Sequence, residues 1–250
     1  MAASKTTSGG RVPRYDIAVI NASTQCDDAE IESYVPALQQ QVSDDFAPAW
    51  GVDARLTFVA RNTKPSTDAW WLVVLDNSDQ AGALGYHDLT ATGHPIGKVF
   101  AASDVAYGSS VSVTMSHELL EMLGDPGINM TVSAPDDHGD ALFYAYEACD
   151  ACEADEYGYK VGDVLVSDFV YPSWFGGVHA VQFDYQGHIK KPFAILSGGY
   201  IGVWRPTSGW TQITGAEAHG LTHRSRPSVG SRRERRRTER TRWALSTAFA

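Results

Sequence analysis

The chain has 250 residues, of which 43% are hydrophobic and 20% charged, a composition typical of a soluble protein with a sizeable core. Its net charge of −10 divides unevenly, because the segment from His223 holds nine arginines and two glutamates, a charge of +7, which leaves −17 for the rest. Such an acidic body argues against nucleic acid as its main partner and is compatible with a divalent cation.

The first half of the chain predicts an α/β domain. Residues 1–14 have no apolar period and are expected to form a flexible leader. Asp27 or Asp28 can cap a helix that backs a sheet. Residues 82–88, which contain two glycines, are predicted to form a loop with a solvated His87. Strands are expected at residues 15–20, 55–60, 70–75 and 97–101.

A second helix is predicted to begin at Ser109 or Ser110 and to run to about Leu123, where Gly124 and the residues after it end it. The second half of the chain is expected to be rich in strand and coil. Its predicted parts are a strand at residues 142–146, an acidic stretch at 147–156, a hairpin over 157–161 and 164–171, and aromatic-rich coil up to 210.

The cysteines and the apolar segments restrict the class of protein further. Cys149 and Cys152 form one Cys-x-x-Cys pair that lacks the strand-to-helix setting of a thioredoxin site, so reduced thiols are expected. No stretch approaches the ~18 to 20 apolar residues of a membrane span, and the leader lacks the apolar segment of a secretory signal. The sequence thus predicts a cytoplasmic or otherwise unsecreted protein without a membrane partner.

The second predicted helix carries the motif His117-Glu118-Leu119-Leu120-Glu121. Residues four apart lie on one face of a helix, so His117 and Glu121 can present a nitrogen and a carboxylate to one ion, with Glu118 beside it. The opposite face carries apolar residues and can pack on the sheet. Those residues are Met115, Leu119, Met122 and Leu123.

This motif resembles the His-Glu-x-x-His helix of the zincin metallopeptidases, and the order of elements from about Tyr15 to Asp125 resembles their N-terminal half. The resemblance implies that His117 is a metal ligand and that Glu118 is the general base acting on a metal-activated water. It also implies that Glu121 is a ligand in the place of the second histidine, which is a departure from the family pattern. A further departure is Gly127, which occupies the third-ligand position of the metzincin branch but has no side chain that could bind a metal.

The third ligand remains open. Asp125 cannot reach an ion held by His117 unless the helix breaks at Gly124, because eight helical residues rise ~12 Å. Glu147 needs no such break and arrives from a later element, as in the glutamate-type zincins, so it is preferred. The remaining alternatives are Asp150, Glu153 and His138.

We therefore expect a zincin-like twisted mixed sheet with a backing helix and a metal-site helix, followed by a β- and coil-rich half. A single domain would span residues 15–215, with halves 15–125 and 126–215, before a disordered arginine-rich tail at 216–250. The predicted function is a metal-dependent peptidase or hydrolase acting on peptides or proteins. Zinc is the expected metal, and the oxygen-rich donor set also suits manganese or calcium.

Two other functions compete with hydrolysis. One is a non-catalytic binding or structural protein on the same scaffold, which the glutamate at position 121 favours. The other is a nucleic-acid-associated protein that acts through its basic tail, for which binding should depend steeply on salt.

Overall fold

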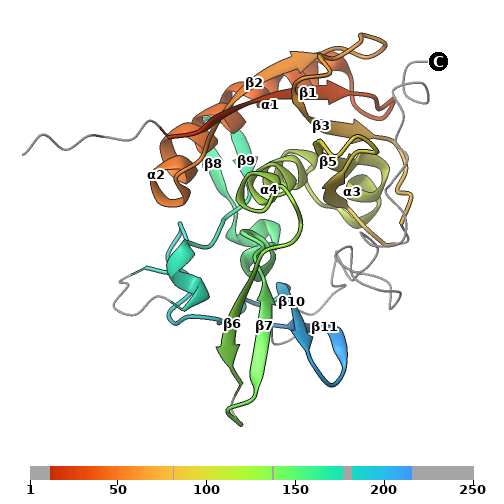
Figure 1. Ribbon diagram of the computed structural model, residues 1–250. Helices are drawn as coiled ribbons and strands as arrows, with labels where there is room; N and C mark the ends of the chain where they lie inside the picture. Colours follow the sequence, from red (N-terminus) through yellow and green to blue (C-terminus); the bar gives the residue numbers. More distant parts are fainter. Residues whose placement is uncertain (1–11, 81, 137, 177–181, 216–250) are drawn as a thin grey trace, which may run out of the picture.

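The structure is a computed structural model that describes residues 12–80, 82–136, 138–176 and 182–215. The expected leader up to residue 11 and the arginine-rich tail from residue 216 lie outside these ranges. The described part is a mixed α/β structure with separate sheets (Figure 1). Within it, no helix is long and apolar enough to cross a membrane.

A five-stranded sheet forms the first half of the molecule, in the order β2-β1-β3-β5-β4. The pairs β1–β2, β1–β3 and β3–β5 are parallel, and β4 runs antiparallel to β5 at the edge. The strands are β1 (Arg14–Asn21), β2 (Asp53–Val59), β3 (Trp70–Leu75), β4 (Gly85–Leu89) and β5 (Pro95–Phe100). The four predicted strands are thus confirmed, with small shifts at their ends.

The edge strand β4 corrects the prediction of a loop at residues 82–88. His87 is fully buried in β4 rather than solvated, and it lies opposite Gly97 of β5. The strand predicted at residues 97–101 is the inner strand β5, which lies between β3 and β4. Pairing with β5 supplies the backbone hydrogen bonds of this short segment, so tertiary context outweighs its glycine-rich sequence.

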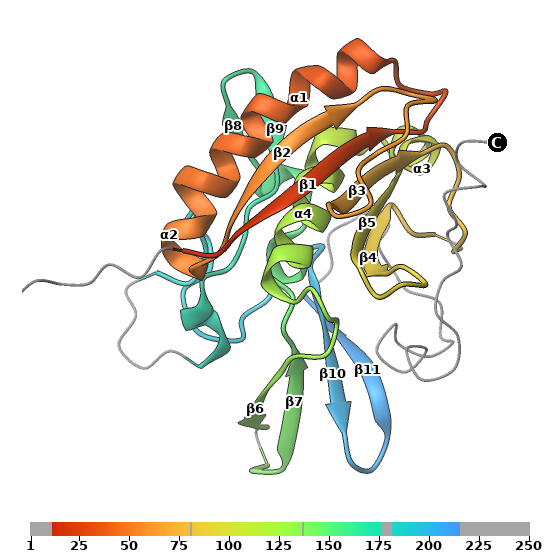
Figure 2. The same cartoon turned by 45° about the horizontal axis from the view of Figure 1, so that its top comes forward.

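Helices cover one face of this sheet. The backing helix α1 (Asp28–Gln40) begins after Asp27, whose side chain accepts a hydrogen bond from the backbone of Glu30. The chain remains helical through the π-helical η1 (Gln41–Phe46) and α2 (Ala47–Trp50). A short helix, α3 (Ala101–Tyr107), was not predicted and precedes the site helix α4 (Val111–Gly124). Figure 2 shows α1 lying along β2 and β1.

The helix α4 ends at the predicted Gly124, which does not adopt a positive φ angle. A Cβ atom on Gly124 would lie 3.1 Å from the Trp50 ring, which a larger residue would have to displace. The glycine therefore permits close packing of α4 against α2.

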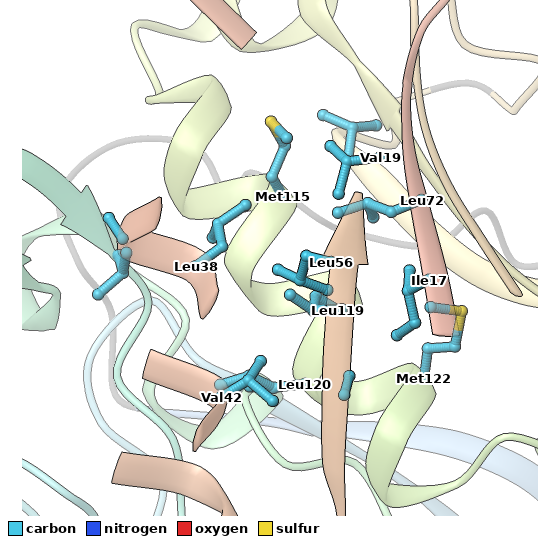
Figure 3. Close-up of a cluster of buried hydrophobic side chains, with 14 of the residues drawn as sticks. Ile17, Val19, Leu38, Val42, Leu56, Leu72, Met115, Leu119, Leu120 and Met122 are labelled. Carbon is cyan, nitrogen blue, oxygen red and sulfur yellow. The ribbon is translucent and has the colours of Figure 1, made fainter. Parts of the chain in front are cut away.

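The main core lies between the sheet, α1 and α4 (Figure 3). Met115, Leu119 and Met122 of α4 pack there, as the apolar face predicted. The rest of α4 is also enclosed, because every residue from Val111 to Leu123 is buried. The helix therefore carries its histidine and glutamates into the interior, which excludes a solvated acidic helix.

The second half contains more strands than the sequence predicted. A four-stranded sheet, in the order β11-β10-β7-β6, extends away from the first sheet (Figure 2). Of its strands, only β7 was predicted from its apolar pattern. The strand β10 lies where coil was expected, and it forms a hairpin with β11, which lies mostly beyond the predicted coil. The predicted hairpin at 157–171 is present, and both of its strands are shorter than predicted. The bounds are β6 (Thr131–Pro135), β7 (Ala141–Ala145), β8 (Tyr159–Val161), β9 (Val164–Val166), β10 (Tyr200–Arg205) and β11 (Gly209–Thr214).

Candidate metal centre

The helix α4 presents His117 and Glu121 on one face, one helical turn apart. The distance from His117 Nε2 to Glu121 Oε1 is 3.1 Å, and the two side chains are 1% exposed. A hydrogen bond from the backbone N–H of Cys149 to the same carboxylate oxygen, 3.3 Å long, helps to orient Glu121. The predicted pairing of these two residues on one helix face is present in the structure.

Asp150 approaches the same histidine from another element. It begins the short 3-10 helix η2 (Asp150–Cys152), and its Oδ1 atom lies 3.4 Å from His117 Nε2. Donor atoms of His117, Glu121 and Asp150 all lie within 4.8 Å of one another. Neighbouring ligands around an ion at 2.0–2.2 Å are roughly 3.3–3.6 Å apart in a tetrahedral arrangement. The three side chains therefore have the spacing of a coordination sphere.

His87 joins the cluster from the edge strand β4, and sequence reasoning missed it. Its Nδ1 atom lies 3.6 Å from Glu121 Oε2 and 3.8 Å from Glu118 Oε2. These three residues form a second group whose donor atoms lie within 4.8 Å of one another. The sequence signal that could have indicated His87 is its spacing from Gly85. Residues two apart in a strand share one face, so both lie on the face of β4 that meets Glu118.

Glu147, the preferred third ligand, is buried in the same cluster but lies beside His87. Its Oε2 atom is 3.6 Å from His87 Nε2. Of the alternatives, Glu153 is buried shortly after η2, and His138 is exposed in the turn between β6 and β7. Asp125 accepts hydrogen bonds from the backbone of residues 129 and 130, so its carboxylate stabilises the turn after α4.

Two glycines make room for Glu118 beneath the edge of the sheet. A Cβ atom on Gly85 would lie 2.7 Å from Glu118 Oε1 and 2.9 Å from the backbone oxygen of Lys98. A Cβ atom on Gly97 would lie 3.5 Å from Glu118 Cβ and 2.9 Å from Leu72. The sheet therefore approaches α4 closely at the point where the glutamate points toward β4.

We expect Gly85→Ala to destabilise the fold by ~1–3 kcal/mol, the usual cost of overpacking a core, and to weaken metal binding by displacing Glu118. Thermal unfolding and a metal titration would measure both effects. Gly202→Ala in β10 is the matched control, because a Cβ atom there would meet Ala145 at 3.4 Å. Equal effects of the two substitutions would contradict this account of Gly85.

Hydrogen bonds between buried side chains fix α4 beside these ligands. Ser116 donates to Gln41 Oε1 at 2.6 Å and accepts from the backbone of Ser167 at 3.0 Å. Gln41 in turn donates to the Ser167 carbonyl at 2.8 Å. The closed triangle joins η1, α4 and the segment after β9, so it resists any rotation of α4 that would move His117.

Electrostatics favour an ionised Glu121. Burial raises the pKa of a carboxyl group, but the imidazoles of His117 and His87 outweigh burial here, so the pKa of Glu121 lies well below its usual range. The cluster brings together the four buried carboxylates of Glu118, Glu121, Glu147 and Asp150. Buried charges of one sign require opposite charges nearby, which a bound cation would supply.

The two neighbouring cysteines do not have the surroundings of reactive thiols. Neither Cys149 nor Cys152 forms a disulfide within the described residues, and both are fully buried. Burial, and after it the negative charge of Asp168, raises the pKa of Cys152 well above its usual range. A thiol in such surroundings is inert, because the thiolate is the reactive form.

The candidate metal centre thus combines His117 and Glu121 of α4 with Asp150 of η2, and places His87, Glu118 and Glu147 beside them. Function has to be inferred from this chemistry. Comparisons with models of known protein families, with curated proteins and with solved structures found no match for the chain.

Proposed function

We propose that the protein is a metal-dependent hydrolase, with peptides as the expected substrate class. The observation that carries this proposal is the donor set of His117, Glu121 and Asp150, which lies beside a further carboxylate, Glu118, on the same helix. A metal-assisted hydrolase requires these two parts, a ligand set and an adjacent general base.

A zincin-like scaffold is part of the proposal. It is supported by the antiparallel edge strand β4, the inner strand β5 and the site helix α4, which packs against both. In this arrangement a peptide would lie along β4, because an edge strand offers backbone hydrogen-bonding groups to an extended chain.

The donors fit a divalent cation of borderline to hard character. One imidazole nitrogen and two carboxylate oxygens satisfy zinc with a fourth position open, and the excess of oxygen also suits manganese or calcium. Asp150 replaces Glu147 in the preferred ligand set, because its carboxylate is the one beside His117 Nε2.

When bound, the cation would polarise the scissile carbonyl and lower the pKa of a water molecule. His117, Glu121 and Asp150 would hold it in place. Glu118 would accept a proton from the attacking water at its carboxylate and then pass it to the leaving amine. The buried surroundings of Glu118 strengthen its interactions with nearby charges, because the local dielectric constant is low.

The decisive experiment is Glu118→Gln, assayed against a peptide library alongside metal analysis. The amide is nearly isosteric but cannot accept the proton, so we expect turnover to fall by ~10²- to 10⁴-fold. The ion held by His117, Glu121 and Asp150 should remain. Glu32→Gln, on the exposed side of α1, is the control and should leave turnover unchanged. Undiminished turnover in Glu118→Gln would reject the mechanism.

A second candidate function is supported by the burial of the site. His117, Glu118 and Glu121 are at most 2% exposed, and structural metal sites are closed whereas catalytic sites keep an open position. This structural role would be supported if the wild type bound metal tightly but, like Glu118→Gln, turned over no peptide of the library.

A further inference from the structure

Glu121 directs its two carboxylate oxygens toward different histidines. Oε1 lies 3.1 Å from His117 Nε2, whereas Oε2 lies 3.6 Å from His87 Nδ1. Asp150 stands beside the first histidine, and Glu118 stands beside the second. Each side of Glu121 therefore has one imidazole nitrogen and one further carboxylate.

The spacing within each group suits a separate ion. The distances from each histidine to the carboxylates of its group run from 3.1 to 3.8 Å, close to the roughly 3.3–3.6 Å expected between neighbouring ligands. In the described chain, donors lying within 4.8 Å of one another divide into two groups that share only Glu121. A single ion could not be ligated by all five side chains without rearranging them.

Charge balance is consistent with two ions. Fully ionised, the four buried carboxylates of the cluster would carry four negative charges, of which one dication would balance two. Two dications neutralise all four while both imidazoles stay neutral, as metal ligation requires. The side chain of Lys98, a buried cation nearby, donates hydrogen bonds to Asp79 at 2.8 Å and to the Tyr86 hydroxyl. Tyr86 precedes His87 in β4, so its side chain faces the other side of the strand.

Glu147 explains which nitrogen of His87 is available. Its carboxylate faces Nε2 at 3.6 Å, so it favours a proton on that nitrogen. The lone pair then lies on Nδ1, which faces Glu118 and Glu121. A carboxylate behind a ligating histidine is a common device for orienting the ring and raising its basicity.

We propose that the centre binds two divalent cations bridged by Glu121. His117 and Asp150 complete the first site, and His87 and Glu118 complete the second. Glu118 enters the second site through Oε2, which leaves Oε1 to accept a proton. The inference rests on the first site of the proposed function and adds a second ion to it.

The test is the metal stoichiometry of the full chain. Metal-free protein is dialysed against Mn²⁺, the bound metal is counted by mass spectrometry, and electron paramagnetic resonance reports whether the ions interact. We expect two equivalents with a spin-coupled spectrum, because ions in such two-metal sites lie ~3.5–4 Å apart. His87→Ala and His117→Ala should each bind one equivalent with an uncoupled spectrum. His138→Ala, which removes an exposed histidine, should keep both.

The possible failures are distinct. One equivalent in the wild type, lost in both His87→Ala and His117→Ala, would show a single shared ion and overturn the second site while the proposed function survives. No bound metal in the wild type would overturn both. Circular dichroism identifies any variant that fails to fold, and in that case the wild-type stoichiometry and spectrum alone decide.

Discussion

Glu121→Gln should weaken metal binding more than any other conservative change in the cluster. The substitution keeps the size of the side chain but removes its charge and replaces one of its two oxygens, which face His117 and His87. Loss of a residue that only supports a ligand costs ~10- to 100-fold in affinity, so loss of a ligand shared by both groups should cost more than that. Competition with a chelator of known affinity would measure the dissociation constant.

Glu32→Gln again serves as the control, because it removes an equal charge from the exposed side of α1. Its affinity should match that of the wild type. If Glu121→Gln bound metal equally well, the cluster would be an arrangement of buried acids and histidines without a metal ligand at its centre.

Removing the metal should lower the thermal stability of the protein substantially. Without a cation, the four carboxylates of the cluster are left in a buried environment, which favours unfolding or protonation. A ligand at 100 times its dissociation constant stabilises the folded state by ~2.7 kcal/mol, which for a chain of this size corresponds to roughly 5–10 °C in Tm. Calorimetry with increasing Zn²⁺ or Mn²⁺, after treatment with a chelator, would measure the shift.

The same titration carries its own controls. Glu121→Gln should show little change in Tm with added metal, since it lacks the shared ligand. Lowering the pH should reduce the shift in the wild type, because protons compete with the cation for the ligands. A Tm independent of metal at every pH would contradict metal binding by the folded state.

The helix motif could be predicted from the sequence because its information is local. The spacing of His117 and Glu121, together with the apolar residues on the other face, is sufficient to define a buried helix that carries a pair of polar groups. The strands β1, β2 and β3 were predictable for the same reason, since β1 and β3 contain short apolar runs and β2 alternates apolar with polar or β-branched residues.

His87 and Asp150 could not be chosen in the same way, because their positions depend on distant parts of the chain. His87 becomes buried only when β4 pairs with β5 and α4 closes over it. Asp150 rather than Glu147 faces His117, and the chain bends between them at Ala148 and Cys149. Such a bend leaves no periodic pattern. The β10–β11 hairpin likewise depends on its pairing with β7.

The distribution of the ligands along the chain affects the order of events during synthesis. The donors are spread along the chain from His87 to Asp150. They come from β4, from α4 and from the segment around η2. Because the N-terminal part of a chain leaves the ribosome first, the five-stranded sheet and α4 can emerge before Glu147 and Asp150 have left it. A nascent chain arrested at that point would expose His117 and Glu121 as an incomplete and weak site. In the proposed metal centre, selection of the cation would therefore fall to the late stages of folding, when the last carboxylates close over the helix.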